Sequence, residues 1–286
     1  MTKILVTGAT GFVGNHVVAW LLKNNYEVIA TATSADKAKL FPWYSQVKFI
    51  PCDYFHEEHD FYDYFERPEI IIHLAWKGLP NYMDQIHMEN LYASHKLLAD
   101  FIKHKSTKIV VIGTDKEYGV VNGCLSEDMI TNPNTVYGLA KDTLRKNVEM
   151  MAGQEGFNWN WIRLFFVYGP GQNPKSLLPQ LDAAIERGDK EFPMSGGEQI
   201  RDYLHIERAA EYICKIALQR KINGVVNCCS GEMISVRRLV ENKIKERSSS
   251  IELKLGVYGY SAFEGMAFWG STEKLKLLFD YGLLDY

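Results

Sequence analysis

The chain has 286 residues, 47% of them hydrophobic, and a formal net charge of −3 at pH 7. This size supports one large or two modest hydrophobic cores, and the charge gives no support for a surface that binds nucleic acid or an anionic membrane. The sequence contains no run of about 18 apolar residues, and its first residues lack the apolar core of a signal peptide, so we expect a cytoplasmic protein that does not enter a membrane.

Segments of strand and helix character alternate along the first part of the chain. Short apolar runs predict strands at 3–8, 27–33, 48–53, 69–76, 108–114 and 158–169. Apolar residues at helical spacing predict helices at 14–25, 89–105 and 136–156. Strands that alternate with helices are typical of a parallel sheet covered on both faces. We therefore expect an α/β fold built on a Rossmann-type doubly wound parallel sheet.

The rhythm changes after about residue 167, where prolines and glycines interrupt it. Shorter elements follow, namely a helix near 206–219, a strand at 224–230 and a helix near 235–247. We predict a dinucleotide-binding domain over residues 1–166 and a smaller C-terminal, substrate-binding lobe over residues 167–286. The chain can cross back from this lobe to the first domain.

The cysteines indicate neither disulfides nor zinc. They are Cys52, Cys124, Cys214, Cys228 and Cys229. They show no C-x-x-C spacing, and sequence neighbours rarely bridge each other. We therefore expect reduced thiols, as in a cytosolic protein, and because the histidines are scattered we expect no metal site.

The stretch TGATGFVG joins the first predicted strand to the first predicted helix. In a phosphate-binding turn of this spacing, Gly8 allows the tight turn, Gly11 lets the backbone approach a pyrophosphate, and Gly14 lets the helix pack on the strand. The amides at the helix N-terminus then face the phosphates. A turn with only a structural role is the alternative. The residues expected to contact a dinucleotide here are Gly8, Thr10, Gly11, Phe12 and Val13.

The end of the second predicted strand indicates which dinucleotide binds. An NAD-preferring site usually carries Asp or Glu there, bonded to the ribose hydroxyls. Residues 31–34 contain no acid, and Lys37 follows closely. Because a carboxylate would repel a 2′-phosphate that hydroxyls and a lysine tolerate, we expect NADP(H) rather than NAD(H), held by Thr33, Ser34 and Lys37. Asp53, after the third strand, either meets the adenine amine or is an ordinary turn aspartate.

Tyr137 and Lys141, in YGLAK, lie one helical turn apart and share a face of the helix. A phenol has a reference pKa of about 10, but a nearby ammonium favours the phenolate. The pair follows GTDKEYG, the mouth of the fifth strand, and open α/β sheets bind ligands at the carboxyl ends of their strands. We therefore predict that Tyr137 exchanges a proton with a substrate oxygen, that Lys141 tunes Tyr137 and holds the ribose, and that Thr114 presents its hydroxyl to the same carbonyl.

TGATGFVG, IIHLAW, GTDKEYG, YGLAK and RDYLHIERAAEYI, in this order, resemble the extended short-chain dehydrogenase/reductase family. The most similar branch is the NAD-dependent epimerase/dehydratase family, whose members act on nucleotide sugars. The resemblance spans nearly the whole chain and implies the same roles for the hydroxyl, phenol and amine named above. It further implies that Leu74, Ala75 and Trp76 lie beside the cofactor and that Arg201 holds the diphosphate of the substrate, a task that suits a guanidinium.

Two departures bear on the place of the chain within that family. Members often have asparagine where FFVYG has Phe166, so we expect a rearranged phosphate site in which Arg201 bears more of the binding. Asp115 and Lys116 resemble a motif of sugar 4,6-dehydratases, in which the acid expels the C6 hydroxyl. HLAWKGLPNY, CLSEDM, FVYGPGQNPKSLL, SGGEQIRDYL and MAFWG instead resemble short 4-keto reductases that make deoxysugars for surface polysaccharides such as O-antigen.

The resemblance thus predicts NAD(P)H-dependent reduction of the C4 keto group of a nucleotide-activated 4-keto-6-deoxyhexose. A 4,6-dehydratase and a C4 or C5 epimerase are alternatives among enzymes, and a non-catalytic regulator that senses NADP is the alternative outside them. The residues expected to contact the substrate are Lys77, Tyr82, Asp115, Lys116, Phe166 and Arg201.

Several residues keep two interpretations. Trp76, Lys77 and Tyr82 either form a wall for the sugar or base or pack an excursion of the chain. His73 follows three isoleucines and is expected in the core rather than in acid–base catalysis. The helices at 89–105 and 136–153 commonly form a four-helix dimer interface in the family, which implies a homodimer.

Overall fold

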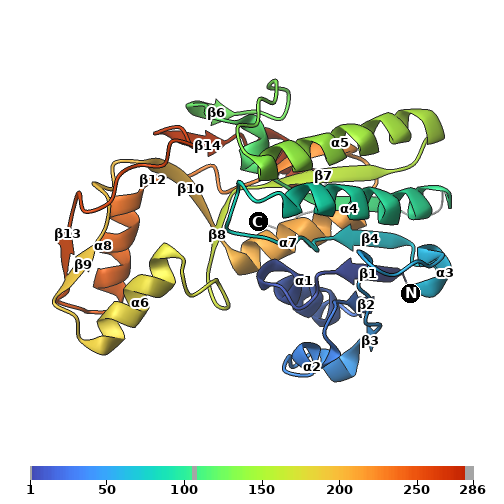
Figure 1. Ribbon diagram of the computed structural model, residues 1–286, viewed down its shortest axis with the longest axis horizontal. Coiled ribbons are helices and arrows are strands. Elements are labelled where there is room, and N and C mark those ends of the chain that lie inside the picture. The colour runs from blue at the N-terminus through green and yellow to red at the C-terminus, as the bar shows by residue number, and fades with distance from the viewer. Residues whose placement is uncertain (1, 105–107, 281–286) are drawn as a thin grey trace.

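The structure is a computed structural model that describes residues 2–104 and 108–280, and within these residues seven strands form one parallel sheet (Figure 1). The strand order is β11-β7-β5-β4-β1-β2-β3. The strands are β1 (Lys3–Thr7), β2 (Glu27–Thr31), β3 (Lys48–Phe49), β4 (Ile70–His73), β5 (Lys108–Thr114), β7 (Trp159–Leu164) and β11 (Gly224–Cys228). The order runs outward from β1 in one direction and from β4 in the other, which is the topology of a doubly wound sheet. The predicted fold class is therefore confirmed.

A pair of helices packs on each face of this sheet (Figure 1). They are α1 (Phe12–Lys23) with α7 (Ile206–Leu218) on one face and α4 (Ile86–Ile102) with α5 (Val136–Glu155) on the other. Alternate residues of β1 serve the two cores, since Ile4 and Val6 pack under the first pair and Leu5 packs under the second. Strands buried on both faces read as continuous apolar runs, which is why they were visible in the sequence. No helix in the described ranges is long and apolar enough to span a bilayer.

A smaller lobe with its own core lies at one end of the molecule (Figure 1). Its elements are α6 (Leu177–Arg187), β9 (Glu191–Pro193), α8 (Val236–Glu246) and β13 (Glu252–Lys254). Its buried side chains are Leu181, Ala184, Phe192, Met194, Val240 and Ile251. Between α6 and α8 the chain returns to the large sheet to add α7 and β11, so it crosses between the two parts more than once. The division into two domains at residue 166 stays a prediction.

Short strands connect the lobe to the carboxyl edge of the sheet. They are β8 (Phe166–Tyr168), β10 (Ile200–His205) and β12 (Met233–Ser235), which form one sheet, and β6 (Gly123–Leu125) and β14 (Phe268–Gly270), which form another. The remaining helices and 3-10 turns are α2 (Ala35–Ala38), η1 (Tyr44–Gln46), α3 (Phe61–Tyr64), η2 (Asp115–Tyr118) and α9 (Glu273–Asp280).

Two predicted strands differ from the observed ones. The run at 158–169 is split, because the chain leaves the large sheet at Phe165 and Phe166 then pairs with Tyr203 of β10. The strand predicted at 48–53 is shorter, since β3 ends before Pro51, which has no amide hydrogen to donate. The split matters for the site, because it turns Phe166 toward the lobe.

Candidate active site

The carboxyl ends of β1, β4, β5 and β7 meet at one edge of the sheet, where Thr7 pairs with His73 and Thr114 pairs with Leu164. Two hollows open at this edge. The turn hollow is lined by residues that include Gly8, Gly11, Thr31, Thr33, Lys37 and Lys77. The tyrosine hollow is lined by residues that include Trp76, Tyr82, Thr114, Lys116, Tyr137 and Phe166. Both hollows share Gly8, Gly11, Leu74 and Trp76, so one elongated ligand can occupy the two.

The glycine turn between β1 and α1 requires its glycines. Gly8 has a φ of 66°, and a Cβ atom on it would lie 2.8 Å from the backbone of Ala75. A Cβ atom on Gly14 would lie 2.2 Å from the carbonyl oxygen of Gly8. The N-cap of α1 is Gly11, which has no side chain to accept hydrogen bonds from the first amides of the helix. These amides are therefore open to an anion. The predicted dinucleotide contacts that line the hollows are Gly8, Thr10, Gly11, Phe12, Val13, Leu74, Ala75 and Trp76.

Thr31, at the end of β2, supports a ribose site. Its Oγ1 is buried and has no hydrogen-bond partner within the described ranges, which is rare for a buried hydroxyl. Thr31 lines the turn hollow where doubly wound folds hold a ribose, so the residues present fit a dinucleotide. Thr33 and Lys37 line the same hollow, whereas the hydroxyl of Ser34 accepts a hydrogen bond from the amide of Lys37 at 3.1 Å and caps α2.

Asp53 and Lys77 form an ion pair at the turn hollow. The Nζ atom of Lys77 lies 3.2 Å from Oδ1 of Asp53 and 3.8 Å from the centroid of the Phe55 ring. The structure therefore places Lys77 on the dinucleotide side, whereas the sequence predicted a contact with the substrate. An interaction of Asp53 with adenine stays a prediction.

Tyr137 and Lys141 project from the first turns of α5 into the tyrosine hollow. Lys141 Nζ donates to the carbonyl oxygen of Ile112 at 2.7 Å and lies 3.8 Å from the centroid of the Trp76 ring. Burial lowers the pKa of the Lys141 ammonium to about 7. Burial also raises the pKa of the Tyr137 phenol above its ordinary value of 10.0, and the opposing hydrogen bond with Thr114 is weaker. A phenol with a raised pKa carries its proton at neutral pH and can donate it to a substrate oxygen.

Aromatic side chains enclose Tyr137. Tyr82 stacks on it with 5.7 Å between ring centroids and 24° between ring planes, and Trp76 meets it edge-on at 6.0 Å. The indole N–H of Trp76 donates to Nδ1 of His87 at 3.0 Å, and this buried histidine, to which the sequence assigned no role, also lies 5.1 Å from the Tyr137 ring. The geometry therefore favours a wall of the hollow over simple packing for Trp76 and Tyr82.

The polar residues after β5 form a compact hydrogen-bonded turn. Thr114 Oγ1 donates to Oδ1 of Asp115 at 3.1 Å and accepts from the amide of Lys116 at 3.3 Å. Lys116 Nζ lies 2.9 Å from Oδ2 of Asp115 and 2.9 Å from Oε1 of Glu264. Burial alone would lower the pKa of Lys116, but these two carboxylates raise it above its ordinary value. Asp115 and Lys116 thus enter the tyrosine hollow as an ion pair.

Glu117 supports this turn by hydrogen bonds, and the sequence did not predict it as a site residue. Its fully buried carboxylate accepts from the amide of Thr114 at 2.9 Å, from the indole of Trp161 at 2.8 Å and from Nε of Arg163 at 2.8 Å. The sequence signal was an acid at the mouth of a buried strand. Two of its partners, Trp161 and Arg163, lie on β7, and no local pattern could pair them with it.

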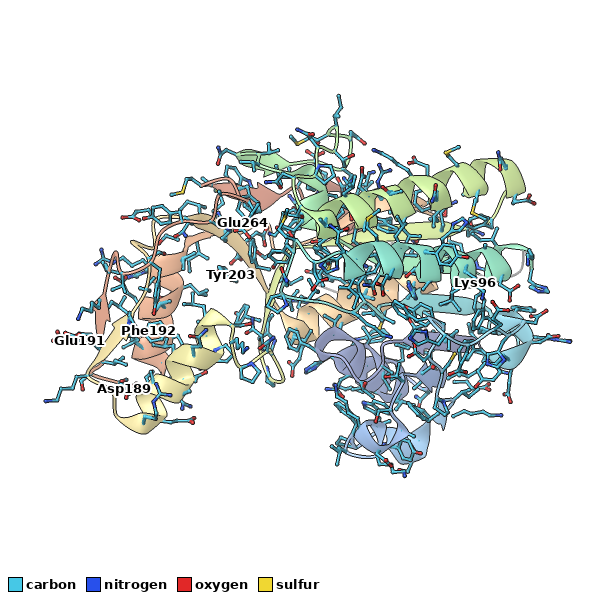
Figure 2. The ribbon with its side chains drawn as sticks, viewed as in Figure 1. Lys96, Asp189, Glu191, Phe192, Tyr203 and Glu264 are labelled. Carbon is cyan, nitrogen blue, oxygen red and sulfur yellow. The ribbon has the colours of Figure 1, made fainter. Side chains whose placement is uncertain are left out.

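Arg201 reaches the same region from β10. Its Nη2 lies 2.9 Å from Oε2 of Glu264, and its guanidinium lies 4.5 Å from the centroid of the Phe268 ring. Glu264 was not predicted as a site residue, and Figure 2 shows it with Tyr203 where the lobe meets the sheet. Burial opposes ionisation of Glu264, but Lys116 and Arg201 hold its pKa below the ordinary range. The cation expected to hold a diphosphate is therefore paired with a carboxylate.

His73 behaves as the sequence predicted, since it is fully buried. Its Nδ1 lies 2.9 Å from Oγ1 of Thr7 and its Nε2 lies 3.0 Å from Oγ of Ser94. Burial lowers the pKa of His73 to about 3, so the ring is neutral and structural. No group of side chains suited to a metal ion occurs among residues 2–104 and 108–280.

A neutral phenol beside a threonine hydroxyl can deliver a proton to a carbonyl oxygen. The shared hollow brings this pair next to a phosphate-binding turn, where a bound dinucleotide can exchange hydride with the carbonyl carbon.

Comparisons with known proteins agree with this geometry. The model of the NAD dependent epimerase/dehydratase family matches residues 4–229. A dTDP-6-deoxy-L-talose 4-dehydrogenase (NAD(+)) of Aggregatibacter actinomycetemcomitans is 28% identical over 271 residues, which cover 94% of this chain and 99% of that protein. A GDP-6-deoxy-D-talose 4-dehydrogenase of the same organism is 25% identical over 258 residues, which cover 88% of this chain and 82% of that protein.

A solved structure shows the same fold. UDP-N-acetylglucosamine 4-epimerase from Methanobrevibacter ruminantium M1, in complex with UDP-N-acetylmuramic acid, superposes with a TM-score of 0.86 at 22% identity. The superposition covers 96% of this chain and 91% of that chain.

Replacing Glu117 with alanine is expected to destabilise the protein strongly. The substitution leaves Arg163 as a buried charge without its partner, and breaking a buried ion pair in this way costs about 3–5 kcal/mol. The free energy of unfolding, measured by urea denaturation, checks this. Glu241→Ala, which removes a partner of Arg237 on the surface of α8, is the control and should change the unfolding midpoint little. Equal effects of the two substitutions would show that Glu117 does not support the strand mouth.

Proposed function

The chain belongs to the NAD dependent epimerase/dehydratase family, whose relatives here modify nucleotide sugars, and we propose that it reduces the C4 keto group of a nucleotide-activated 4-keto-6-deoxyhexose. The observation that carries this proposal is the placing of Tyr137, stacked on Tyr82 in the hollow that adjoins the glycine turn, where burial raises the pKa of its phenol. Two relatives support the sugar position, because both are named 4-dehydrogenases of 6-deoxytalose nucleotides. Oxidation at C4 is the reverse of reduction of a 4-keto group.

In this mechanism a nicotinamide dinucleotide held at the glycine turn supplies the hydride. Tyr137 binds the C4 carbonyl oxygen and donates its phenolic proton to it as the alcohol forms, and Thr114 adds a second hydrogen bond once its single O–H turns from Asp115 to that oxygen. Lys141 holds the ribose and, as an ammonium, stabilises the phenolate that remains. The aromatic side chains of Trp76 and Tyr82 exclude water from the reacting atoms.

The hydrogen bonds of Asp115 favour reduction over 4,6-dehydration. A dehydratase needs a protonated acid to expel a hydroxyl group, as the resemblance of this stretch suggested. Both oxygens of Asp115 instead accept hydrogen bonds, Oδ1 from Thr114 and Oδ2 from Lys116. With both oxygens engaged by donors, Asp115 is poorly placed to give a proton to a leaving C6 hydroxyl.

The reaction is tested by adding NADPH or NADH to a panel of nucleotide-linked 4-keto-6-deoxyhexoses and following the cofactor absorbance. A reductase oxidises one cofactor per sugar. Tyr137→Phe should lower kcat by roughly 10²–10⁴-fold, since it removes the proton donor. Tyr26→Phe, a partly buried tyrosine of the opposite layer, is the control and should keep the wild-type rate.

Other outcomes would contradict the proposal. Sugar isomerisation without net cofactor consumption indicates an epimerase, and a keto product formed from a nucleotide hexose without added cofactor indicates a dehydratase. Cofactor binding without turnover of any sugar indicates a regulator. Full turnover by Tyr137→Phe would remove the phenol from the mechanism.

We infer that the cofactor is NADP(H). The family and one relative are described by NAD, so this preference would be a property of the present chain. It is supported by the turn hollow, which Thr33 and Lys37 line, and whose nearby carboxylate, Asp53, is already paired with Lys77. Such a surface accepts a 2′-phosphate that an unpaired acid would repel.

Lys37→Ala is expected to lower kcat/KM for NADPH by roughly tenfold, because it removes a charged contact with the 2′-phosphate, and to leave kcat/KM for NADH unchanged. The ratio of the two values, measured in steady-state assays, checks this. Lys39→Ala, which removes an exposed ammonium paired with Asp36, should leave the ratio unchanged. A wild-type enzyme that prefers NADH would contradict the inference.

We also propose a homodimer formed by α4 and α5 of two copies. The two helices pack side by side (Figure 1). Both also expose large apolar residues. Met88 and Tyr92 lie one turn apart on α4, with 40% and 75% of their surface exposed, and Leu139 and Met150 lie three turns apart on α5, with 48% and 65% exposed. Two such stripes on adjacent helices suit a four-helix interface with a second copy.

Tyr92→Glu is expected to convert the dimer to monomers, because it buries a charge in the apolar interface. Sedimentation equilibrium measures the mass. Leu40→Glu, at a position that is 82% exposed near α2, is the control and should leave the mass unchanged. A wild-type protein that is monomeric at micromolar concentration would contradict the proposal.

A further inference from the structure

Glu264 bridges the two cations nearest the proposed sugar site. Its Oε1 lies 2.9 Å from Nζ of Lys116, and its Oε2 lies 2.9 Å from Nη2 of Arg201. Both cationic side chains are nearly inaccessible, with 7% and 5% of their surface exposed, whereas Glu264 is 16% exposed. The carboxylate is therefore the most accessible of the three charged groups.

Other donors of the two cations also bond to the protein. Arg201 Nη1 donates to the carbonyl oxygens of Ile200 and Met266, at 2.9 Å and 3.2 Å, so the edge that carries Nη2 is the one turned to Glu264. Lys116 gives a second hydrogen bond to Asp115. Glu264 thus occupies the positions that two oxygens of a phosphate group would take, since a carboxylate and a phosphate can each span two donors.

The charges of this cluster already balance. Lys116 and Arg201 contribute +2, and Asp115 and Glu264 contribute −2, so the sum is zero. A diphosphate beside this cluster would add negative charge next to a buried carboxylate, which is unfavourable in a site of low polarity. If Glu264 leaves, the cluster has a charge of +1, and Lys116 and Arg201 each lose one ion-pair partner.

The segment that carries Glu264 is suited to such a movement. Residues 255–266 form no helix or strand, and the exposed side chains of Tyr258, Tyr260 and Phe263 lie in this part of the chain. Its backbone anchors lie at its two ends, where the amide of Val257 bonds to Met194 and the amide of Ile200 bonds to Met266, and between them the Tyr260 hydroxyl donates to Glu198. Apolar side chains left in solvent gain contacts if the segment closes over a ligand.

We propose that Glu264 is an internal competitor of the substrate, and that the diphosphate of the nucleotide sugar displaces it from Lys116 and Arg201. This inference rests on the proposed function, because that function supplies the diphosphate. Glu264 then sets specificity. A ligand with two negative charges displaces the carboxylate, whereas a ligand with one charge exchanges one ion pair for another and gains little.

Glu264→Gln tests the inference. The amide keeps the shape of the side chain and removes its charge, so the cations are left ready for phosphate. Titration calorimetry with UDP, CDP, GDP and dTDP should give a dissociation constant about tenfold lower than that of the wild-type protein for the best-bound nucleotide. In turnover assays the same variant should lower KM for the sugar nucleotide and leave kcat nearly unchanged. Glu198→Gln, whose carboxylate accepts from the Tyr260 hydroxyl and contacts neither cation, is the matched control and should bind as the wild type does.

Three outcomes separate the inference from the function on which it rests. Weaker or unchanged nucleotide binding by a folded Glu264→Gln overturns the inference, because Glu264 would then hold Arg201 in position rather than compete with the ligand. If the wild type also binds a nucleoside diphosphate, and Arg201→Gln weakens that binding, the proposed substrate class survives this result. If neither the wild type nor Glu264→Gln binds any of the nucleotides at millimolar concentration, the substrate class and the inference both fail.

Discussion

The buried carboxylate of Glu117 is the constraint on which the candidate site depends. An ionised group deep in a sheet is tolerated only when its oxygens are fully bonded, and Glu117 meets this condition with donors from two adjacent strands. Its bond to the amide of Thr114 determines where β5 ends and the polar turn begins. Its bonds to Trp161 and Arg163 tie that turn to β7. The hydroxyl of Thr114 is therefore positioned by a carboxylate that touches neither hollow.

Burial acts differently on the two lysines of the tyrosine hollow, and the difference assigns their roles. Lys141 has a carbonyl oxygen and an aromatic ring as neighbours, so desolvation dominates and its pKa falls to about 7. Lys116 is equally buried but lies between two carboxylates, so its pKa rises and it stays an ammonium. The first lysine can respond to charge that develops on Tyr137. The second is a fixed charge, suited to binding an anion.

The sequence predicted what depends on short-range pattern. The apolar runs located the strands of the large sheet, the spacing of Gly8, Gly11 and Gly14 located the turn, and the helical register of Tyr137 and Lys141 placed both in one hollow. It did not reveal Glu264, because its partner Arg201 is 63 residues away and the intervening segment has no periodicity. Lys77 was assigned to the substrate because it follows a strand end, but its pairing with Asp53 depends on the distance between two loops, and local sequence does not encode that distance.

Phe166 connects these observations. Members of the family often carry an asparagine at this position, and its replacement by Phe166 predicted more phosphate binding by Arg201. The centroid of the Phe166 ring lies 4.6 Å from Nζ of Lys116 and 5.6 Å from the guanidinium of Arg201. The ring therefore attracts both cations by cation–π interactions and contributes no hydrogen bond. An aromatic ring in this position stabilises the two cations without neutralising their charge. Because the ring adds no negative charge, an anion completes the cluster, and a carboxylate of the protein and a phosphate of a ligand can each satisfy the same two donors.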